Sequence, residues 1–313
     1  MDRHCVASVT ARDFLKNARK PDYFKLIQKE YYSIVARRID KPISNFVKPE
    51  NQAKNRYLDI PCWDHSRVVL DVKTGGSDYI HANWIDGFEK PKKFIATQGP
   101  MANTTADFWK LVWQQCCYVI VMLTNAKVQS EEKCHQYWSP TKNGSLVVDE
   151  YCIKTLSVTA RTNYIRTIIQ ITDKSLKESR KLTHFQYINW FEYNTPSDLS
   201  RFVHFMTTID RVRQAYMELF FEPNEAFPCP VVVHCSAGVG RTGTFCAVDI
   251  CLNQVVKTLN LCIPEVVFNI REQRCSGVMS YRQYSFIYQV LEYFLSAQKN
   301  VDRPFTNECL HGF

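Results

Sequence analysis

Cys235, Arg241 and Thr242 stand in one short stretch whose residue types could carry out chemistry on a phosphate ester. The stretch runs from an apolar, β-branched segment at 231–233 through His234 and Cys235 into a loop with two glycines, and then into a helical pattern. Glycines between a strand and a helix let successive backbone N–H groups turn inward and bind an anion. The positive end of the helix also lowers the pKa of a nearby thiol, which predicts that Cys235 is a nucleophilic thiolate.

Arg241 and Thr242 extend this predicted site. A guanidinium six residues after the cysteine can hold two oxygens of a phosphoryl group, and the Thr242 hydroxyl could reach the sulfur. The pattern therefore predicts attack of a thiolate on a phosphate ester. A cysteine and an arginine at this spacing could also arise by chance in a chain with thirteen cysteines, because most free cysteines are inert core residues. The backbone N–H groups predicted to bind the phosphoryl group belong to Ser236, Ala237, Gly238, Val239, Gly240 and Arg241.

Alternating strand and helix patterns must position this loop. Periodicity predicts two N-terminal helices between residues 9 and 38, broken at Pro21, and Ser197 is predicted to cap a later helix. A continuous apolar run at 118–123 predicts a buried strand. Further strands are predicted at 78–85, at 94–100 and within 146–190, and further helices through 108–113, after Ser197, at 244–256, from Pro264 and from Ser280.

Composition limits the partners and the compartment. The 313 residues are 45% hydrophobic and 22% charged, which is typical of a globular protein. A net charge of +8 favours an anionic partner, but no basic run is long enough to predict nucleic-acid binding. We expect no signal peptide and no membrane-spanning segment. Thirteen cysteines without a Cys-x-x-C pair favour reduced thiols in a cytoplasm.

The string His-Cys-Ser-Ala-Gly-Val-Gly-Arg-Thr-Gly at 234–243 resembles the signature loop of the protein tyrosine phosphatases. Further family motifs follow in the family's order, and the resemblance covers about residues 20–297. It implies one α/β domain within 1–313, with a twisted mixed sheet, helices on both sides and the N-terminal helices packed on it. Cys235 would be the nucleophile, and Arg241 would bind and stabilise the phosphoryl group. His234 would help to hold the loop, although a hydrogen-bonded core histidine explains it equally well.

Residues 54–59 resemble the phosphotyrosine-recognition loop of the family. By that resemblance, Tyr57 stacks on the substrate ring and deepens the pocket, so that only the long phosphotyrosine reaches the thiolate. Asp59 would hold the backbone N–H groups of the substrate. Leu58 stands where many family members carry a polar residue. Without the resemblance, the same segment is interpreted as a hydrogen-bonded surface loop.

The segment 190–196 resembles the mobile loop of the family, which normally reads Trp-Pro-Asp and continues through a glycine to a proline. Trp190 is retained, but Phe191 replaces the proline, Glu192 the aspartate and Asn194 the glycine. Glu192 is the candidate general acid, and its carboxyl is one methylene farther from the backbone than that of an aspartate. A surface turn without a catalytic role is the alternative interpretation.

Two more departures affect the predicted chemistry. Val128 aligns with a glutamate that usually holds the signature arginine, so Glu131 or a shifted loop must compensate, or Arg241 is held less firmly. Met279 replaces a glutamine that positions the hydrolytic water, while the second glutamine of the family is present as Gln283. Met279 either slows the clearing of the intermediate or packs against apolar neighbours while another residue positions the water.

The resemblance implies hydrolysis of phosphotyrosine in proteins through a cysteinyl-phosphate, without a metal or cofactor, by a cytoplasmic monomer. Within the family, the chain looks closest to the bracovirus tyrosine phosphatases delivered by parasitoid wasps. That narrower resemblance implies action in the host cytoplasm on signalling and immune-cell behaviour. Two alternatives remain open: a weakly active protein that binds and sequesters phosphotyrosine partners, and a phosphatase for lipids or phosphoserine, against which Tyr57 argues.

Overall fold

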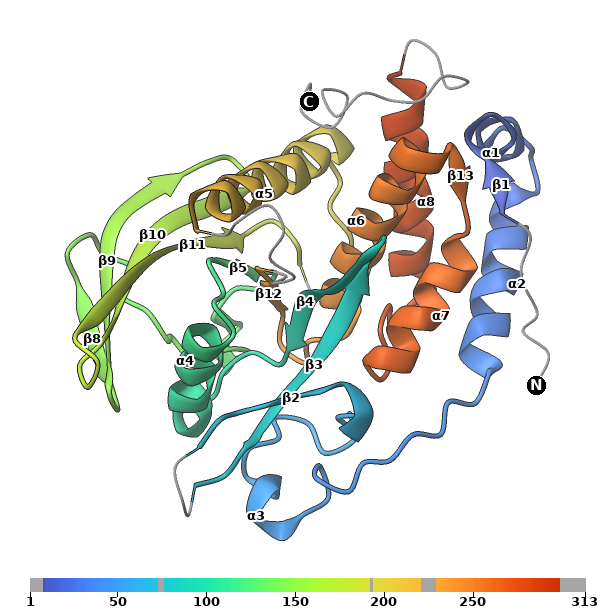
Figure 1. The fold of residues 1–313 in the computed structure, drawn as a ribbon. Helices are drawn as coiled ribbons and strands as arrows, with labels where there is room; N and C mark the ends of the chain where they lie inside the picture. The colour runs from blue at the N-terminus through green and yellow to red at the C-terminus, as the bar shows by residue number, and fades with distance from the viewer. Residues whose placement is uncertain (1–7, 73–75, 192–193, 221–228, 299–313) are drawn as a thin grey trace.

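A central β-sheet carries the strand that leads into Cys235 (Figure 1). The computed structural model describes residues 8–72, 76–191, 194–220 and 229–298. Within these residues the sheet has nine strands in the order β2-β3-β4-β12-β5-β11-β10-β9-β8. The strands are β2 Arg67–Val69, β3 Tyr79–Gly87, β4 Lys90–Thr97, β5 Val119–Met122, β8 Ser145–Val148, β9 Tyr151–Ala160, β10 Tyr164–Asp173, β11 Glu178–Tyr187 and β12 Val231–His234.

The sheet is mixed, and its parallel part surrounds β12. This strand pairs in parallel with β4 and β5, and β5 pairs in parallel with β11, while the outer pairs are antiparallel. Val231 and Val233 belong to the hydrophobic core on one face, and Val232 belongs to the core on the other. A strand buried on both faces needs an unbroken apolar run, which explains the three valines before His234.

Helices cover both faces of the sheet, as the family resemblance implied. On one face lie α5 (Leu199–Phe220), α6 (Gly240–Thr258), α7 (Ile263–Gln273) and α8 (Tyr281–Ser296), and on the other lies α4 (Thr105–Gln114) (Figure 1). The N-terminal helices α1 (Ala11–Ala18) and α2 (Tyr23–Ala36) pack on α8, and α2 also contacts α7. None of the described helices combines the length and the apolar character that crossing a membrane requires.

The short elements complete the description. They are α3 (Pro49–Gln52), the 3-10 helices η1 (Asp64–Ser66) and η2 (Ala102–Thr104), and the two-residue strands β1 (Val9–Thr10), β6 (Lys127–Val128), β7 (Glu131–Glu132) and β13 (Asn260–Leu261). The sequence predicted a helix from residue 9, but residues 9 and 10 form β1 and pair with β13. Helix α1 begins at Ala11, and Thr10 caps it by accepting a hydrogen bond from the Asp13 N–H.

Two predicted helix caps had different outcomes. Ser280 caps α8, because its hydroxyl accepts a hydrogen bond from the Gln283 N–H at 3.2 Å. The prediction that Ser197 caps α5 was wrong. The Asp198 carboxylate accepts from the Arg201 N–H at 2.9 Å and satisfies a free donor of the first turn. A serine and an aspartate in succession give equivalent capping signals in the sequence.

Candidate active site

The signature loop, residues 235–241, connects the carboxyl end of β12 with the first turn of α6. Gly238 has a φ of 70°, a conformation that favours glycine. A Cβ at this position would lie 2.1 Å from the Thr97 carbonyl oxygen. The backbone of β4 therefore presses against the loop where a side chain would otherwise stand, and glycine is required here for two reasons.

The carbonyl groups of the signature loop are bound from outside the loop. The Ser236 carbonyl accepts from the Gly99 N–H at 2.7 Å, and the Val239 carbonyl accepts from the Gly243 N–H at 2.8 Å. With its carbonyls engaged outward, the loop turns N–H groups toward the sulfur, and the Gly238 N–H lies 3.3 Å from Cys235 Sγ. This is the arrangement of backbone donors that binds an anion.

Arg274, which the sequence analysis missed, holds two of these carbonyls. Its side chain is fully buried, and it donates to the Gly238 carbonyl at 3.1 Å and to the Ala237 carbonyl at 3.0 Å. Asn83 accepts a third hydrogen bond from it at 2.7 Å. Nothing in the sequence distinguishes Arg274 from a surface arginine, because its partners are backbone atoms and a residue 191 positions away.

The environment of Cys235 favours the thiolate. Burial of the side chain would raise the pKa of the thiol, but the Arg241 charge lowers it, as do the Thr242 hydroxyl, the Thr242 N–H and the Gly238 N–H. The outcome is a pKa below the ordinary value. Among the described residues, the buried Thr242 hydroxyl oxygen has no hydrogen-bond partner. The lowered pKa agrees with the prediction that Cys235 is a thiolate near the Thr242 hydroxyl.

Backbone carbonyls hold Arg241. One guanidinium nitrogen, Nη1, donates to the Leu123 carbonyl at 3.0 Å and to the Trp190 carbonyl at 3.1 Å. Of the alternatives for Val128, compensation by Glu131 does not occur, because Glu131 is exposed and pairs with Lys133 at 2.6 Å. Across the described residues Arg241 forms no ion pair, so its other guanidinium nitrogens keep their donors for a ligand.

His234 both holds the signature loop and is a hydrogen-bonded core residue, so the two roles considered from the sequence are compatible. It is fully buried, and burial lowers its pKa to about 4, which leaves the ring neutral at physiological pH. Its Nδ1–H donates to the Cys235 carbonyl at 3.0 Å, and its Nε2 accepts from the Tyr137 hydroxyl at 2.8 Å. The Cys235 carbonyl can only accept, so this contact fixes the proton on Nδ1 and leaves Nε2 as the acceptor.

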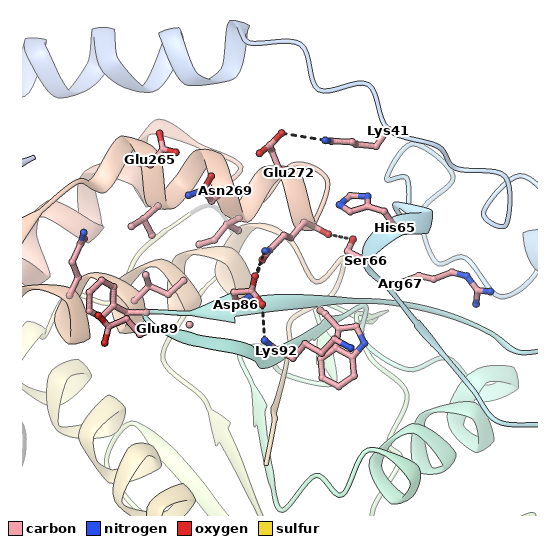
Figure 2. A pocket seen from close by; sticks show the side chains of 18 of the residues that line it. Lys41, His65, Ser66, Arg67, Asp86, Glu89, Lys92, Glu265, Asn269 and Glu272 are labelled. Atoms are coloured by element: carbon pink, nitrogen blue, oxygen red, sulfur yellow. Dashed lines mark hydrogen bonds and ion pairs between the residues drawn. The ribbon is translucent and has the colours of Figure 1, made fainter. Parts of the chain in front are cut away.

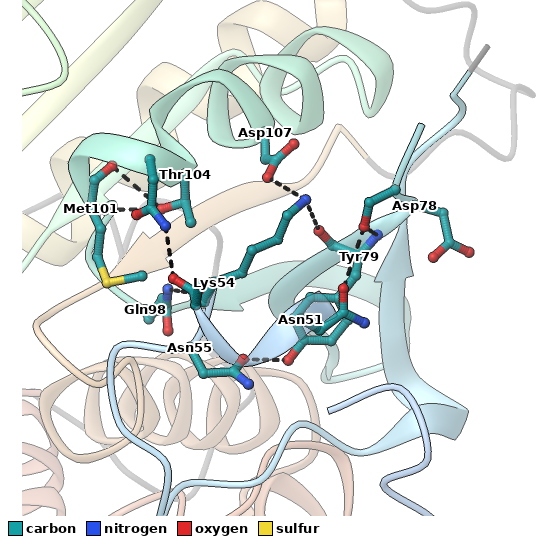
Figure 3. Close-up of polar contacts among 12 residues, drawn as sticks. Asn51, Lys54, Asn55, Asp78, Tyr79, Gln98, Met101, Thr104 and Asp107 are labelled. Atoms are coloured by element: carbon teal, nitrogen blue, oxygen red, sulfur yellow. Dashed lines mark hydrogen bonds and ion pairs between the residues drawn. The ribbon is translucent and has the colours of Figure 1, made fainter. Parts of the chain in front are cut away.

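Tyr57 reaches the signature loop through its hydroxyl, which lies 2.9 Å from Ser236 Oγ. Figure 3 shows how the preceding residues are fixed: the Lys54 ammonium pairs with Asp107 at 2.9 Å, and the Lys54 carbonyl accepts from the Gln98 side chain at 2.8 Å. Asp59 is exposed, and the described contacts include no hydrogen bond or ion pair for it. Its carboxylate is therefore available to a ligand.

Arg56 is a second residue that the sequence analysis did not single out. Its guanidinium donates to the Gly99 carbonyl at 3.0 Å, the Pro100 carbonyl at 2.9 Å and the Glu132 carbonyl at 3.0 Å. These bonds tie the segment that carries Tyr57 to the loop after β4. The same loop supplies the Gly99 N–H that binds the signature loop.

Trp190 anchors the segment after β11. Its indole N–H donates to the Asn194 carbonyl at 2.9 Å, and Arg282 of α8 donates to the Asn194 side-chain oxygen at 2.5 Å. Phe191 is exposed over 63% of its surface. Glu192, the predicted acid, lies outside the described residues. The first described end of this segment nevertheless reaches the active site, because the Trp190 carbonyl contacts Arg241.

Gln283 lies against the signature loop, as its predicted role requires. A Cβ placed on Gly240 would come within 2.8 Å of the Gln283 amide nitrogen. The Met279 N–H donates to the Gln283 amide oxygen at 2.9 Å and so orients the amide. The Met279 side chain is 54% exposed, which disagrees with the interpretation that it simply packs among apolar neighbours.

A cavity of about 970 Å³ lies away from this site, between α7 and the β3–β4 hairpin (Figure 2). Two polar contacts join residues that line it: Lys41 pairs with Glu272 at 3.4 Å, and the Gln273 amide donates to Asp86 at 2.7 Å. None of the site residues predicted from the sequence lines it.

Comparisons with known proteins agree with this geometry. A family model described as protein-tyrosine phosphatase matches residues 51–293. "Probable tyrosine phosphatase protein N1" of Microplitis demolitor bracovirus (isolate Webb) is 40% identical over 297 residues, which cover 93% of this chain and 92% of that protein. Human "Tyrosine-protein phosphatase non-receptor type 9" is 36% identical over 273 residues, which cover 85% of this chain and 45% of that protein.

The fold has a counterpart among solved structures. A chain from the structure described as "Structural basis of PTPN18 fingerprint on distinct HER2 tyrosine phosphorylation sites" superposes with a TM-score of 0.80 at 28% sequence identity. The match covers 92% of this chain and 99% of that chain. Together with the family model and the bracovirus relatives, this similarity establishes that the chain belongs to the protein-tyrosine phosphatase family, a family of hydrolases.

Proposed function

We propose that this chain hydrolyses phosphotyrosine in proteins in two steps. In the first, the Cys235 thiolate attacks phosphorus, the bond from phosphorus to the tyrosyl oxygen breaks, and Glu192 gives its proton to the departing phenolate. In the second, water attacks the cysteinyl-phosphate, its proton passes to Glu192, and the sulfur–phosphorus bond breaks. Inorganic phosphate leaves and the thiolate is restored. No metal or cofactor takes part in this proposal.

The observation that carries the proposal is the position of the Cys235 sulfur among donors that favour negative charge. The Gly238 N–H lies 3.3 Å from the sulfur, and the Arg241 charge and the Thr242 hydroxyl lower the pKa of the thiol despite its burial. Donors fixed before the reaction stabilise the charge on a phosphoryl group without reorganising during the step. The outward-bound carbonyls keep these donors in place.

Substrate recognition follows from the residues at the entrance. Tyr57, whose hydroxyl contacts Ser236, would stack on the ring of the phosphotyrosine. Asp59, exposed and without a described partner, would accept hydrogen bonds from the substrate backbone. With Tyr57 at the entrance, the pocket would be deep. It would favour the long phosphotyrosine side chain over phosphoserine, whose phosphate would not reach the sulfur.

A second candidate function is binding of phosphotyrosine proteins with little turnover. Two observations favour it: Met279 offers no amide for the second step, and no ion pair with a described residue holds Arg241. Both departures leave the anion-binding loop intact while weakening catalysis. Such a protein would sequester phosphoproteins rather than dephosphorylate them.

A turnover assay separates these functions and the third class considered from the sequence. Purified chain is given a phosphotyrosine peptide, a phosphoserine peptide and a phosphoinositide, with the Cys235→Ser variant as the matched control. Phosphate release from the phosphotyrosine peptide alone, absent in the variant, supports the proposal. Tight binding of that peptide without release supports sequestration, and release from either other substrate contradicts the proposed specificity.

The setting is proposed from the relatives. Bracovirus proteins named as tyrosine phosphatases are 34–40% identical to this chain, which favours action on signalling and immune-cell behaviour inside a host cell. The described cysteines are free thiols, which suits the reducing cytoplasm of that host. Tagged protein expressed in insect cells should be found in the cytoplasm and lower total phosphotyrosine, and light scattering should report a monomer.

A further inference from the structure

Three large apolar side chains stand exposed next to the candidate active site: Leu58 at 64%, Phe191 at 63% and Met279 at 54% exposure. They come from three separate parts of the chain, and we call them the apolar rim. Single exposed apolar residues are normal on a protein surface. Exposed apolar residues on segments that meet at one binding site are different, because exposed apolar surface at such a place marks an interaction.

Two members of the rim follow residues that contact the signature loop directly. Leu58 follows Tyr57, whose hydroxyl lies 2.9 Å from Ser236 Oγ. Phe191 follows Trp190, whose carbonyl accepts from Arg241 at 3.1 Å. Tyr57 and Trp190 are thus turned toward the loop, while the next side chain of each segment is left in solvent.

Met279 is tied to the loop through Gln283. The Met279 N–H donates to the Gln283 amide oxygen at 2.9 Å, and the same amide lies against Gly240. Its side chain remains exposed although its backbone is fixed. The three apolar side chains therefore belong to three of the segments that reach the signature loop from its surroundings.

The position of the apolar rim beside the signature loop indicates what binds there. A phosphorylated tyrosine that enters the signature loop brings its own neighbouring residues to the segments that carry Leu58, Phe191 and Met279. We propose that the apolar rim binds apolar side chains that flank the phosphotyrosine of the substrate, so that this chain prefers phosphotyrosine in an apolar sequence context. The inference rests on the proposed function, because the substrate must first place its phosphate in the signature loop.

Exposed Asp59 agrees with a protein segment as the occupant. An extended peptide offers backbone N–H groups beside its side chains, and a carboxylate next to Leu58 can accept them. Burial of apolar area at about 25 cal/mol per Å² makes one half-exposed leucine or methionine worth about a ten-fold change in affinity.

The test measures binding of peptides to the full chain with Cys235→Ser, so that no substrate is consumed. Two phosphotyrosine peptides are compared by fluorescence anisotropy, one with leucine and isoleucine on both sides of the phosphotyrosine and one with serine and glutamine there. We expect the apolar peptide to bind at least about ten-fold more tightly. Leu58→Gln and Met279→Gln in the same background should each remove much of that preference.

Leu176→Gln is the matched control, because Leu176 is 58% exposed in the turn between β10 and β11 and lies away from the signature loop. It should leave the preference unchanged. Equal binding of the two peptides, or an equal loss in the control, overturns the apolar rim. Self-association of the chain that Leu58→Gln abolishes, without any peptide preference, also overturns it, because the rim would then join two copies.

Hydrolysis of a small aryl phosphate by the wild-type chain tells the two proposals apart. Such a substrate reaches the signature loop and carries no flanking residues. Equal peptide binding together with aryl phosphate hydrolysis overturns the rim and leaves the proposed function standing. If the chain neither hydrolyses the aryl phosphate nor binds either phosphopeptide, both proposals fail.

Discussion

At the scale of single residues, Thr242 acts on the Cys235 sulfur. Its hydroxyl oxygen is buried without a hydrogen-bond partner among the described residues, and the hydroxyl lowers the pKa of the Cys235 thiol. Thr242→Val keeps the shape and removes the donor. The pKa of Cys235 should rise, since the thiolate loses a hydrogen bond, and the acid limb of kcat/KM should move to higher pH.

The matched control is Thr244→Val, in which the lost hydroxyl bonds the Gly240 carbonyl at 2.8 Å and not the sulfur. Its acid limb should stay where the wild type has it. An unchanged limb in Thr242→Val would show that this hydroxyl does not set the ionisation of Cys235.

Because Met279 replaces the glutamine of the family, we expect the second step, hydrolysis of the cysteinyl-phosphate, to be slow. The second step needs a water in line with the sulfur–phosphorus bond, and a thioether is only a weak acceptor. With a good aryl phosphate we expect a burst of about one equivalent of phenol and then a slow steady rate. Met279→Gln should raise the steady rate and leave the burst nearly unchanged.

The position of Gln283 limits this effect. Its amide already lies against Gly240 and can take part of the role of the missing glutamine, so hydrolysis is slowed rather than abolished. A progress curve that is linear from the first turnover, and the same in Met279→Gln, would place the slow step elsewhere.

At the scale of elements, the segment between β11 and α5 should deliver the acid. Trp190 and Asn194 hold its described ends, and Arg282 binds Asn194. Glu192→Gln should lower kcat about a hundred- to ten-thousand-fold for a phosphotyrosine peptide, the usual range for a general acid. The burst rate should change little for an aryl phosphate whose leaving group needs no proton, because the first step then needs no acid. A large loss of the burst rate with that substrate would contradict the acid role.

The elements also show what the sequence could predict. The valines before His234 and the glycines after it identified β12, the signature loop and α6, because each local pattern has one reasonable structure. Arg56 and Arg274 escaped notice because their partners are carbonyls contributed by distant segments. What takes the place of the arginine-holding glutamate stayed open for the same reason: carbonyls of Leu123 and Trp190, which no side-chain pattern reports, bind Arg241.

At the scale of the whole molecule, buried histidines should make the fold sensitive to acid. Burial lowers the pKa of His234 from 6.5 to about 4, and it also lowers the pKa of His81 and of His184. A depressed folded-state pKa gives stability that is fully present above about pH 6.5 and is lost as pH falls toward 4. His234 alone should contribute about 3 kcal/mol over that window.

Urea unfolding between pH 7.5 and 5.5 measures this loss. The free energy of unfolding should fall with pH in the wild type, and the slope should be smaller in His234→Gln by about 1 kcal/mol over this interval. Thr244→Val provides the control, because Thr244 is buried but does not titrate and its replacement should keep the wild-type slope. Identical slopes in all three proteins would mean that His234 is not held neutral by the fold.

The central claim is that Cys235 forms a covalent bond to phosphorus, and rapid acid quenching tests it most directly. Wild-type chain is mixed with a phosphotyrosine peptide, quenched within the first turnover and digested for mass spectrometry. The account predicts one phosphoryl group on the peptide that contains Cys235, and none in Cys235→Ser, which should still bind the substrate. Phosphate release at the wild-type rate by Cys235→Ser, or release by the wild type without any label on Cys235, would contradict it.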